Sequence, residues 1–307
     1  MRLINLFLLQ VIYMSEHSVP TSMVIAAGGG YKIIGLAERG ILAFAPYKDK
    51  NLFERAAREI WFRIGLPEKV WYTKEIANHN GITGIRVRDC LITVPFLKWL
   101  QQAYPDARIE YFYDNLVGNA KHVLPADVPE GIVKASFDPK DAEKYGMKWC
   151  SGEFSHLYLR PRLPIEYDVF YVGSDKGRGD YVMSLQQQFE KMGLKTKFIV
   201  AAASRFGRRK KYYSKPITYE EVLEYDCKSK ALLNIVVPGQ TGASNRDWEA
   251  LYLKAKLITN NSRIKMLDFY KPENVFILGE DSMDRLVEFI NSPLVPVEES
   301  VLQKHLL

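Results

Sequence analysis

The chain has 307 residues, of which 47% are apolar and 25% charged, a composition that suits two folded domains and excludes a largely disordered protein. Its net charge of +6 and its pI near 9.0 favour anionic partners such as nucleotides, phosphorylated lipids, membrane surfaces or nucleic acid, without choosing among them. Cys90, Cys150 and Cys227 are far apart and lack CxxC spacing, so the sequence predicts neither a disulfide framework nor a zinc site.

Residues 1–22 form an N-terminal extension of unclear role. The stretch "MRLINLFLLQVIYM" has one arginine followed by an apolar run, but Asn5 and Gln10 interrupt that run. No small-x-small cleavage site follows it, and about 12 apolar positions are too few to span a bilayer. We therefore expect an extra buried element, a membrane-surface segment or a translated extension rather than a cleaved signal.

Residues 23–160 alternate between strand and helix patterns. "MVIAA" predicts a strand that leads into a turn at Gly28, Gly29 and Gly30, and "LFERAAREIWFRIG" predicts a helix. "GIRVRD" and "RIEYFYD" predict strands on either side of the helical "TVPFLKWLQQAY". "GIVKASFDPKDAEKYGM" reads as strand, turn and helix, with Asp138 as N-cap and Pro139 at the first helical position.

Residues 161–292 predict a second domain after the proline-containing linker "LRPRLPIEY". Strand patterns at "DVFYVG", "TKFIVAA", "ALLNIVV", "KLITNN" and "NVFILG" alternate with helix patterns such as "DYVMSLQQQFEKMG" and "TYEEVLEYDCKS". Strands this apolar belong to a parallel sheet that is covered on both faces. The predicted fold class is therefore α/β, with two Rossmann-like domains and a tail at 293–307.

The loop "VGSDKGRGD", residues 172–180, is the first candidate binding site, because ligands of open parallel sheets bind beyond the carboxyl ends of the strands. Gly173 and Gly177 let a ligand approach the backbone, while Lys176 and Arg178 place positive charge where a diphosphate would lie. A surface turn with solvated charges explains the same pattern equally well.

The loop and helix start in "VPGQTGASNRDWEAL" are the second candidate. A helix N-terminus offers unpaired N–H groups, so Gly242, Ser244 and Asn245 fit an anion cradle, and Arg246 adds a bidentate contact. Glu249 follows three residues later on the same side of the helix, where a carboxylate fits two ribose hydroxyls. A well-capped helix without a ligand is the alternative.

The loop "ASRFGRRKKYY", residues 203–213, is basic, and Tyr212 and Tyr213 lie at its end. It fits a leaving diphosphate, a lipid-diphosphate acceptor or an anionic membrane surface, although most basic loops are simply solvated. No RNA- or DNA-binding module accompanies it, which disfavours a nucleic-acid partner. The histidines occur singly, and the glycines of "AAGGGYKIIG" lack the offsets of a nicotinamide site, so neither a metal centre nor a dehydrogenase is predicted.

The order "VGSDKGR", "ITYEEVLEYDCKSKALLNIVVPGQTGASNRDWEALYLKAKLITNN" and "FYKPENVFILGED" resembles the donor-binding half of bacterial glycosyltransferases of the GT-B fold, those of capsule, exopolysaccharide and lipopolysaccharide assembly. Upstream, "VRDCLIT", "YFYDNLVGN" and "FDPKDAEKYGMKW" extend the resemblance over most of the chain from about residue 50. It implies two domains facing across a cleft, with the helix around Glu249 holding the donor nucleotide, the loop from Gly173 to Arg178 at the diphosphate, and Asn115 on the acceptor side. For the C-terminal tail, the sequence leaves two expectations open: it crosses back to the first domain, as in chains of this fold, or it docks a partner.

The function expected from these patterns is transfer of a sugar from a nucleotide-diphosphate donor to a hydroxyl of a glycan, in surface polysaccharide biosynthesis. Asp89 and Asp114 end predicted strands of the first domain, and either fits a base that deprotonates the acceptor; a helix cap fits equally well. No metal or other cofactor is expected. We expect a cytoplasmic enzyme at the inner face of the membrane, with a lipid-linked acceptor. A sugar-nucleotide epimerase of the same fold and a non-catalytic partner subunit of a glycosyltransferase remain alternatives.

Overall fold

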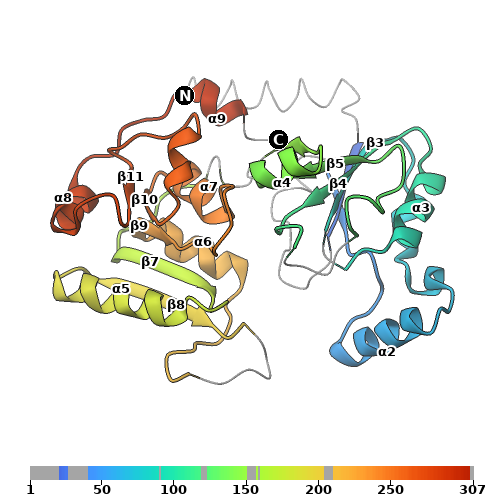
Figure 1. Ribbon diagram of the computed structural model, residues 1–307, viewed down its shortest axis with the longest axis horizontal. Coiled ribbons are helices and arrows are strands. Elements are labelled where there is room, and N and C mark those ends of the chain that lie inside the picture. Colours follow the sequence, from blue (N-terminus) through green and yellow to red (C-terminus); the bar gives the residue numbers. More distant parts are fainter. Residues whose placement is uncertain are drawn as a thin grey trace. The chain divides into compact units, whose positions relative to one another are not determined.

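The computed structural model of the chain describes residues 21–26, 41–89, 91–118, 123–150, 157, 160–203 and 210–304. These residues form two compact units, each built on its own parallel sheet (Figure 1). The first unit holds the described residues up to Ser136 together with Asp141–Cys150. The second holds Phe137–Lys140 and the described residues from Leu157 onward.

The first unit contains a six-stranded parallel sheet in the order β2-β1-β3-β4-β5-β6. Buried and more exposed side chains alternate along the second half of β3, and nearly all side chains of β4 are buried. Ile85 and Val87 of β3 and Tyr111 of β4 are among the residues that form the core of this unit. The strands are β1 (Thr21–Ile25), β2 (Leu42–Phe44), β3 (Ile82–Arg88), β4 (Arg108–Tyr113), β5 (Val133–Ser136) and β6 (Lys148–Trp149).

Side-chain caps set where the helices of the first unit begin. Asn51 accepts from the backbone N–H of Glu54 at the start of α2, and Thr93 accepts from that of Phe96 at the start of α3. Asp138 accepts from the N–H of Lys140, 3.0 Å away, which confirms it as the cap before Pro139. The helices are α2 (Leu52–Arg63), α3 (Val94–Ala103) and the short 3₁₀ helices η2 (Glu68–Trp71) and η3 (Lys74–Asn78). α4 (Pro139–Lys144) begins in the second unit and continues into the first at Asp141.

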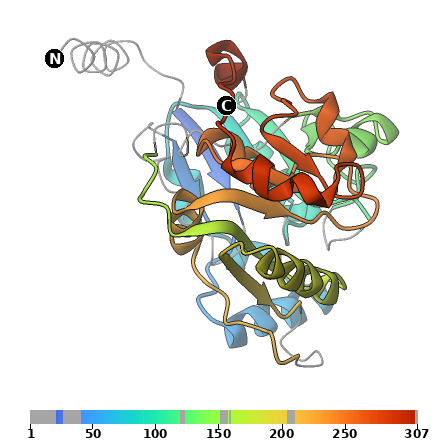
Figure 2. The same cartoon turned by 90° about the vertical axis from the view of Figure 1, so that its left-hand side faces the viewer.

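The second unit contains a five-stranded parallel sheet in the order β11-β10-β9-β7-β8. Helices cover both of its faces. Side chains of α5 and α8 join one core cluster and those of α6 and α7 join the other, and Figure 2 shows α5 running along the sheet beside β8. The strands are β7 (Tyr167–Ser174), β8 (Thr196–Ala201), β9 (Ser229–Asn234), β10 (Lys256–Thr259) and β11 (Val275–Ile277). The helices are α5 (Gly179–Lys191), α6 (Tyr219–Cys227), α7 (Asn245–Tyr252), η4 (Ser262–Met266), η5 (Met283–Arg285), α8 (Leu286–Asn291) and α9 (Glu299–Lys304).

The predicted α/β class with two parallel-sheet units is confirmed. The predicted strands and helices that fall on described residues are all present, and Gly193 ends α5 with a φ of +81°. The sequence patterns miss β2, β6 and α9, and the helix predicted at "DSMDRLVEFINS" begins as η5. The turn predicted at Gly28–Gly30 and residues 1–20 of the extension predicted at 1–22 lie outside the described residues. Thr21 and Ser22, placed in the extension by the prediction, belong to β1. In the part of the chain that is described, no helix has the length and apolar character needed to cross a bilayer.

Candidate functional site

The topology of the second sheet marks one edge as a ligand-binding position. β7 pairs with β8 on one side and β9 on the other, so the strand order reverses at the carboxyl ends of β7 and β9. Such a switch point leaves a crevice between the loops that follow the two strands. The loop after β7 and the loop between β9 and α7 are the first and second candidates from the sequence, and both belong to this switch point.

Arg178 links these two loops. Its guanidinium donates hydrogen bonds to the carbonyl oxygens of Ile235 and of Ser174. A Cβ on Gly173 would lie 2.7 Å from the Tyr171 hydroxyl and 3.2 Å from the guanidinium, so Gly173 leaves room for these side chains. Arg178, predicted as a diphosphate ligand, is thus engaged with the backbone.

Asp175, a residue that the sequence did not single out, occupies the N–H groups of the loop after β7. Its Oδ1 accepts from the backbone N–H groups of Gly177 at 3.0 Å and Gly179 at 2.8 Å, and its Oδ2 accepts from the Tyr213 hydroxyl. The hydrogen bond from Tyr213, followed by those from Gly179 and Lys210, lowers the pKa of Asp175 to about 2. The loop's own carboxylate therefore satisfies the donors that a phosphate would otherwise use.

Lys176 is the exposed cation of the same loop. It has a φ of +44°, in the left-handed region that only a few non-glycine residues adopt, and it makes no ion pair or hydrogen bond with any residue that the structure describes. Its charge is therefore open to solvent beside the switch point, as the sequence predicts for a diphosphate ligand.

The described end of the basic loop is anchored to the start of α5. Lys210 lies 2.7 Å from the Asp180 carboxylate and 3.5 Å from that of Asp175, and the Tyr212 hydroxyl donates to Asp180 at 2.7 Å. The hydrogen bond with Asp180 raises the pKa of Lys210. Arg208 and Arg209, the other half of the basic run, lie outside the described residues.

The loop between β9 and α7 holds the carboxylate of Asp138. This buried side chain accepts from the backbone N–H groups of Thr241 at 2.6 Å and Gly242 at 2.8 Å, all within the second unit. A Cβ on Gly242 would meet the Phe137 carbonyl oxygen at 2.4 Å, so only glycine fits there. The N–H of Ser244 donates to Asp247 at 2.7 Å. Backbone donors predicted to cradle a ligand thus bind the chain's own carboxylates, and the side chain of Asn245 is exposed.

Arg246 lies between two carboxylates. Its Nη1 contacts Oδ1 of Asp226, in the last turn of α6, and Oε2 of Glu249 at 3.0 Å. Its guanidinium lies over the ring of Phe170 in β7, 5.6 Å from the centroid. The Arg246 side chain is 11% exposed and that of Glu249 only 2%. Nε and Nη2 of Arg246 make no hydrogen bond or ion pair with any described residue, so one edge of the guanidinium is unused.

Four buried side-chain oxygens in and around β7 and α7 lack a hydrogen bond: Tyr171 Oη, Asp226 Oδ2, Ser244 Oγ and Glu249 Oε2. Of these, Glu249 Oε2 lies 3.0 Å from Arg246 Nη1 as an ion pair. Burial raises the pKa of Asp226; the nearby Arg246 opposes this shift and Glu249 adds to it. Unsatisfied buried polar atoms are rare and costly, and they concentrate at functional sites. The sequence analysis did not single out Asp226. An acidic residue in the last turn of a helix is unfavourable next to the negative end of the helix dipole, and this unfavourable placement could have indicated a functional residue.

The first unit brings Asp89, Asp114 and Asn115 together at the carboxyl ends of β3 and β4. Asn115 donates to the Asp89 carboxylate from its backbone N–H at 3.1 Å and its side chain at 3.3 Å. Asp89 is buried, which fits a structural contact. Asp114 forms an ion pair with Arg88, and burial raises its pKa.

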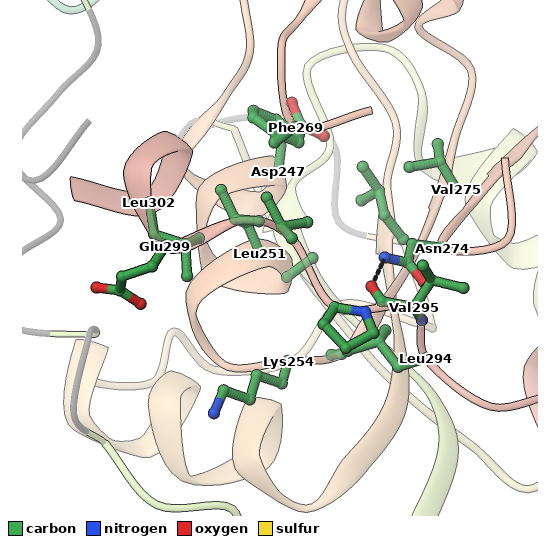
Figure 3. Close-up of a pocket in the computed structure, with 15 residues that line it drawn as sticks. Asp247, Leu251, Lys254, Phe269, Asn274, Val275, Leu294, Val295, Glu299 and Leu302 are labelled. Atoms are coloured by element: carbon green, nitrogen blue, oxygen red, sulfur yellow. Dashed lines mark hydrogen bonds between the residues drawn. The ribbon is translucent and has the colours of Figure 1, made fainter. Parts of the chain in front are cut away.

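A pocket of about 260 Å³ lies on the other flank of α7 (Figure 3). Its walls are mostly apolar and include Leu251, Phe269 and Leu302. The segment at Val295 closes one side, fixed by two hydrogen bonds with Asn274 of 2.7 and 2.9 Å. The tail also packs on the core of the second unit through Val297 and Val301. In the described segments of the chain, no group of three or more His, Cys, Asp or Glu side chains could hold a metal ion.

No protein-family model matches the chain, and no curated protein matches its sequence. Among solved structures, the chain is similar to an alpha-glucosyltransferase in complex with UDP and a 13-mer DNA containing a HMU base, with 12% identity over 85% of this chain and 83% of that chain, and a TM-score of 0.47. It is also similar to the glycotransferase of kitacinnamycin, with 10% identity over 93% of each chain and a TM-score of 0.42. Likenesses at this level assign no activity.

Proposed function

We propose that the chain is a glycosyltransferase that takes its sugar from a nucleotide-diphosphate donor. The observation that carries the proposal is the guanidinium of Arg246, in the first turn of the helix that follows the switch point. Two carboxylates hold Nη1, while Nε and Nη2, which bind no described residue, are the parallel pair of donors that a phosphate accepts. A buried arginine held in this way is preorganised for an anion.

The other donor contacts follow from this position. Lys176 supplies a second, exposed positive charge on the loop after β7. Glu249 is the carboxylate for the ribose hydroxyls. Its Oε2 pairs with Arg246 Nη1 at 3.0 Å but makes no hydrogen bond, so the carboxylate has acceptor capacity left. In glycosyl transfer, negative charge grows on the leaving diphosphate as the sugar becomes oxocarbenium-like, so fixed cations at that point lower the barrier.

The proposed acceptor is a hydroxyl of a lipid-linked glycan in surface polysaccharide assembly, at the cytoplasmic face of the membrane. The resemblance in "RDWEALYLKAKLITNN" supports this assignment. Asp114 is the better candidate for the base of an inverting reaction, because its side chain is 21% exposed whereas Asp89 is buried and accepts two hydrogen bonds from Asn115. The raised pKa of Asp114 fits this role. No metal is required in this proposal, since Arg246 and Lys176 carry the positive charge.

Calorimetric titration with UDP, GDP, CMP and dTDP tests the donor site. We expect one nucleotide to bind selectively and Glu249→Gln to weaken it, whereas Asp168→Asn, a paired carboxylate at the start of β7, leaves binding unchanged. An epimerase would bind the nucleotide equally well but convert a nucleotide sugar without any acceptor. A partner subunit would bind none of the four, and that result would overturn the proposal.

A further inference from the structure

The first unit exposes an apolar face on α2 and the turn that follows it. Half of the large apolar side chains that the described residues expose lie between 52 and 70. The most exposed is Phe53, at 84%; Ile60 is 58% exposed and Ile64 64%. These three positions are seven and four residues apart and share one side of the helix. We call the α2 face the set Leu52, Phe53, Ile60, Arg63, Ile64, Leu66, Lys69 and Val70.

The polarity of α2 is the reverse of an ordinary surface helix. Its buried residue is Arg58, whose guanidinium lies 4.1 Å from the ring centroid of Tyr47 and 3.4 Å from the Asp49 carboxylate. A helix of a soluble domain places apolar residues inward and charged residues in water. In α2, Phe62 packs inward against Tyr47, but the fully buried residue is charged and other apolar side chains face outward. This arrangement matches an apolar environment outside the unit.

Most of the exposed charges around this face are cationic. The exposed charged residues between 51 and 75 are Arg63, Lys69, Lys74 and Glu75. The other acids of this stretch have partners within the protein, although the side chain of Glu59 is 39% exposed. Glu54 accepts from the start of α2, Glu59 pairs with Arg58, and Glu68 accepts from Thr93 and Tyr72. An apolar helix face flanked by free cations is the composition that binds an anionic bilayer surface.

We propose that the α2 face docks the protein on an anionic lipid bilayer, with Phe53, Ile60 and Ile64 inserted at the level of the headgroups and with Arg63 and Lys69 against lipid phosphates. Figure 1 shows α2 at the periphery of the first unit, away from its sheet. The inference names the surface for the membrane contact in the proposed function. It rests on the side chains of α2 and not on the donor site.

Co-sedimentation with lipid vesicles tests the proposal. We expect the full-length protein to bind vesicles of phosphatidylcholine mixed with about one-third phosphatidylglycerol. Phe53→Ser/Ile60→Ser should lower that partitioning at least about tenfold, because two apolar side chains leave the interface. Met266→Ser is the matched control, since Met266 is 77% exposed in the second unit. It should partition like the unmodified protein.

A charge variant separates the two contributions. Arg63→Gln/Lys69→Gln should weaken binding to the anionic vesicles by about tenfold and leave any weak binding to pure phosphatidylcholine unchanged. Added salt should have the same effect as this variant. Melting temperatures close to that of the unmodified protein would show that the folds are intact.

Two outcomes would overturn the proposal. Equal vesicle binding by the protein and by Phe53→Ser/Ile60→Ser would place membrane contact elsewhere in the chain. Absence of vesicle binding would exclude the bilayer as partner, and a dimer that Phe53→Ser/Ile60→Ser dissociates would identify the α2 face as a contact between copies. Nucleotide titration of the same samples tests the donor site independently. A negative result with vesicles therefore does not contradict the proposed donor site.

Discussion

The guanidinium of Arg246 lies 3.0 Å from the carboxylate of Glu249, one helical turn farther along α7. The two residues that the sequence nominates for the two ends of a nucleotide therefore contact each other. The pairing fixes Arg246 through Nη1, while Nε and Nη2 bind no described residue, so in the proposed donor site a phosphate would meet an oriented donor pair. Any substitution of either residue changes both the ligand contacts and this internal ion pair.

Glu249→Gln tests the ribose contact with the least disturbance, because the amide keeps the shape of the side chain and Asp226 still pairs with Arg246. Loss of a charge-assisted hydrogen bond costs about 1.5–3 kcal/mol, so we expect the selected nucleotide to bind about 10- to 150-fold more weakly. Calorimetry gives the dissociation constant, and thermal unfolding reports stability. Unchanged affinity would leave Glu249 with only its structural role in α7.

Lys176→Ala and Asp175→Asn should separate binding from stability within one loop. Lys176 is exposed and unpaired among the described residues, so its removal should weaken nucleotide binding about tenfold and leave the melting temperature unchanged. Asp175 holds the loop through Gly177, Gly179 and Tyr213, so its substitution should lower the melting temperature.

The lowered pKa of Asp175 gives that test a pH signature. A depressed carboxyl pKa adds stability above the unfolded-state value near 4, and the protein loses this contribution as the pH falls towards about 2. The slope of stability between these pH values should therefore be shallower in Asp175→Asn. Equal slopes in both proteins would contradict the assignment.

Asp226 should give the opposite pH dependence. Burial raises its folded-state pKa above the unfolded value near 4, so above that value the folded protein keeps a proton that the unfolded chain has lost, and stability falls as the pH rises through the folded-state pKa. Arg246, Glu249, Arg162 and Cys227 are the titratable or charged neighbours. We expect Asp226→Asn to lack this slope, a difference of at least about 3 °C in melting temperature between pH 4 and pH 9. Parallel melting curves across that range would show that Asp226 is ionised in the folded protein.

Gly242→Ala should destabilise the loop before α7. The added methyl group would lie 2.4 Å from the Phe137 carbonyl oxygen and 2.9 Å from the Asp138 Cα, both backbone atoms that cannot rotate away. Overpacking of this kind costs about 1–3 kcal/mol. Gly118→Ala is the control, because its Cβ would meet nothing within 4 Å. Equal unfolding free energies for the two variants would show that the loop relaxes around the methyl group.

Periodicity predicts the second sheet well because its strands are buried on both faces and its helices begin at recognisable caps, such as Thr218 at the start of α6. The sequence pattern does not predict β2 and β6, because strands of only three and two residues are too short to show a period. At the site, the pattern locates the loops but does not reveal their partners. Asp138 and Asp226 reach the loop and helix from 103 and 20 residues away, and such distant pairings leave no local period in the sequence.

Asp89 and Asp114 lie at the same edge of the first sheet but have different partners, so substituting each in turn separates a structural role from a catalytic one. Asp89 accepts two hydrogen bonds from Asn115 and is buried, so Asp89→Asn should lower the melting temperature. Asp114 is paired with Arg88, and its raised pKa suits proton abstraction. In the proposed inverting reaction, Asp114→Asn should reduce sugar transfer at least about 100-fold while the affinity for nucleotide stays unchanged. Transfer is measured with the nucleotide sugar that calorimetry selects and a lipid-linked acceptor. Full transfer by Asp114→Asn would remove Asp114 as the base and favour a reaction that retains configuration.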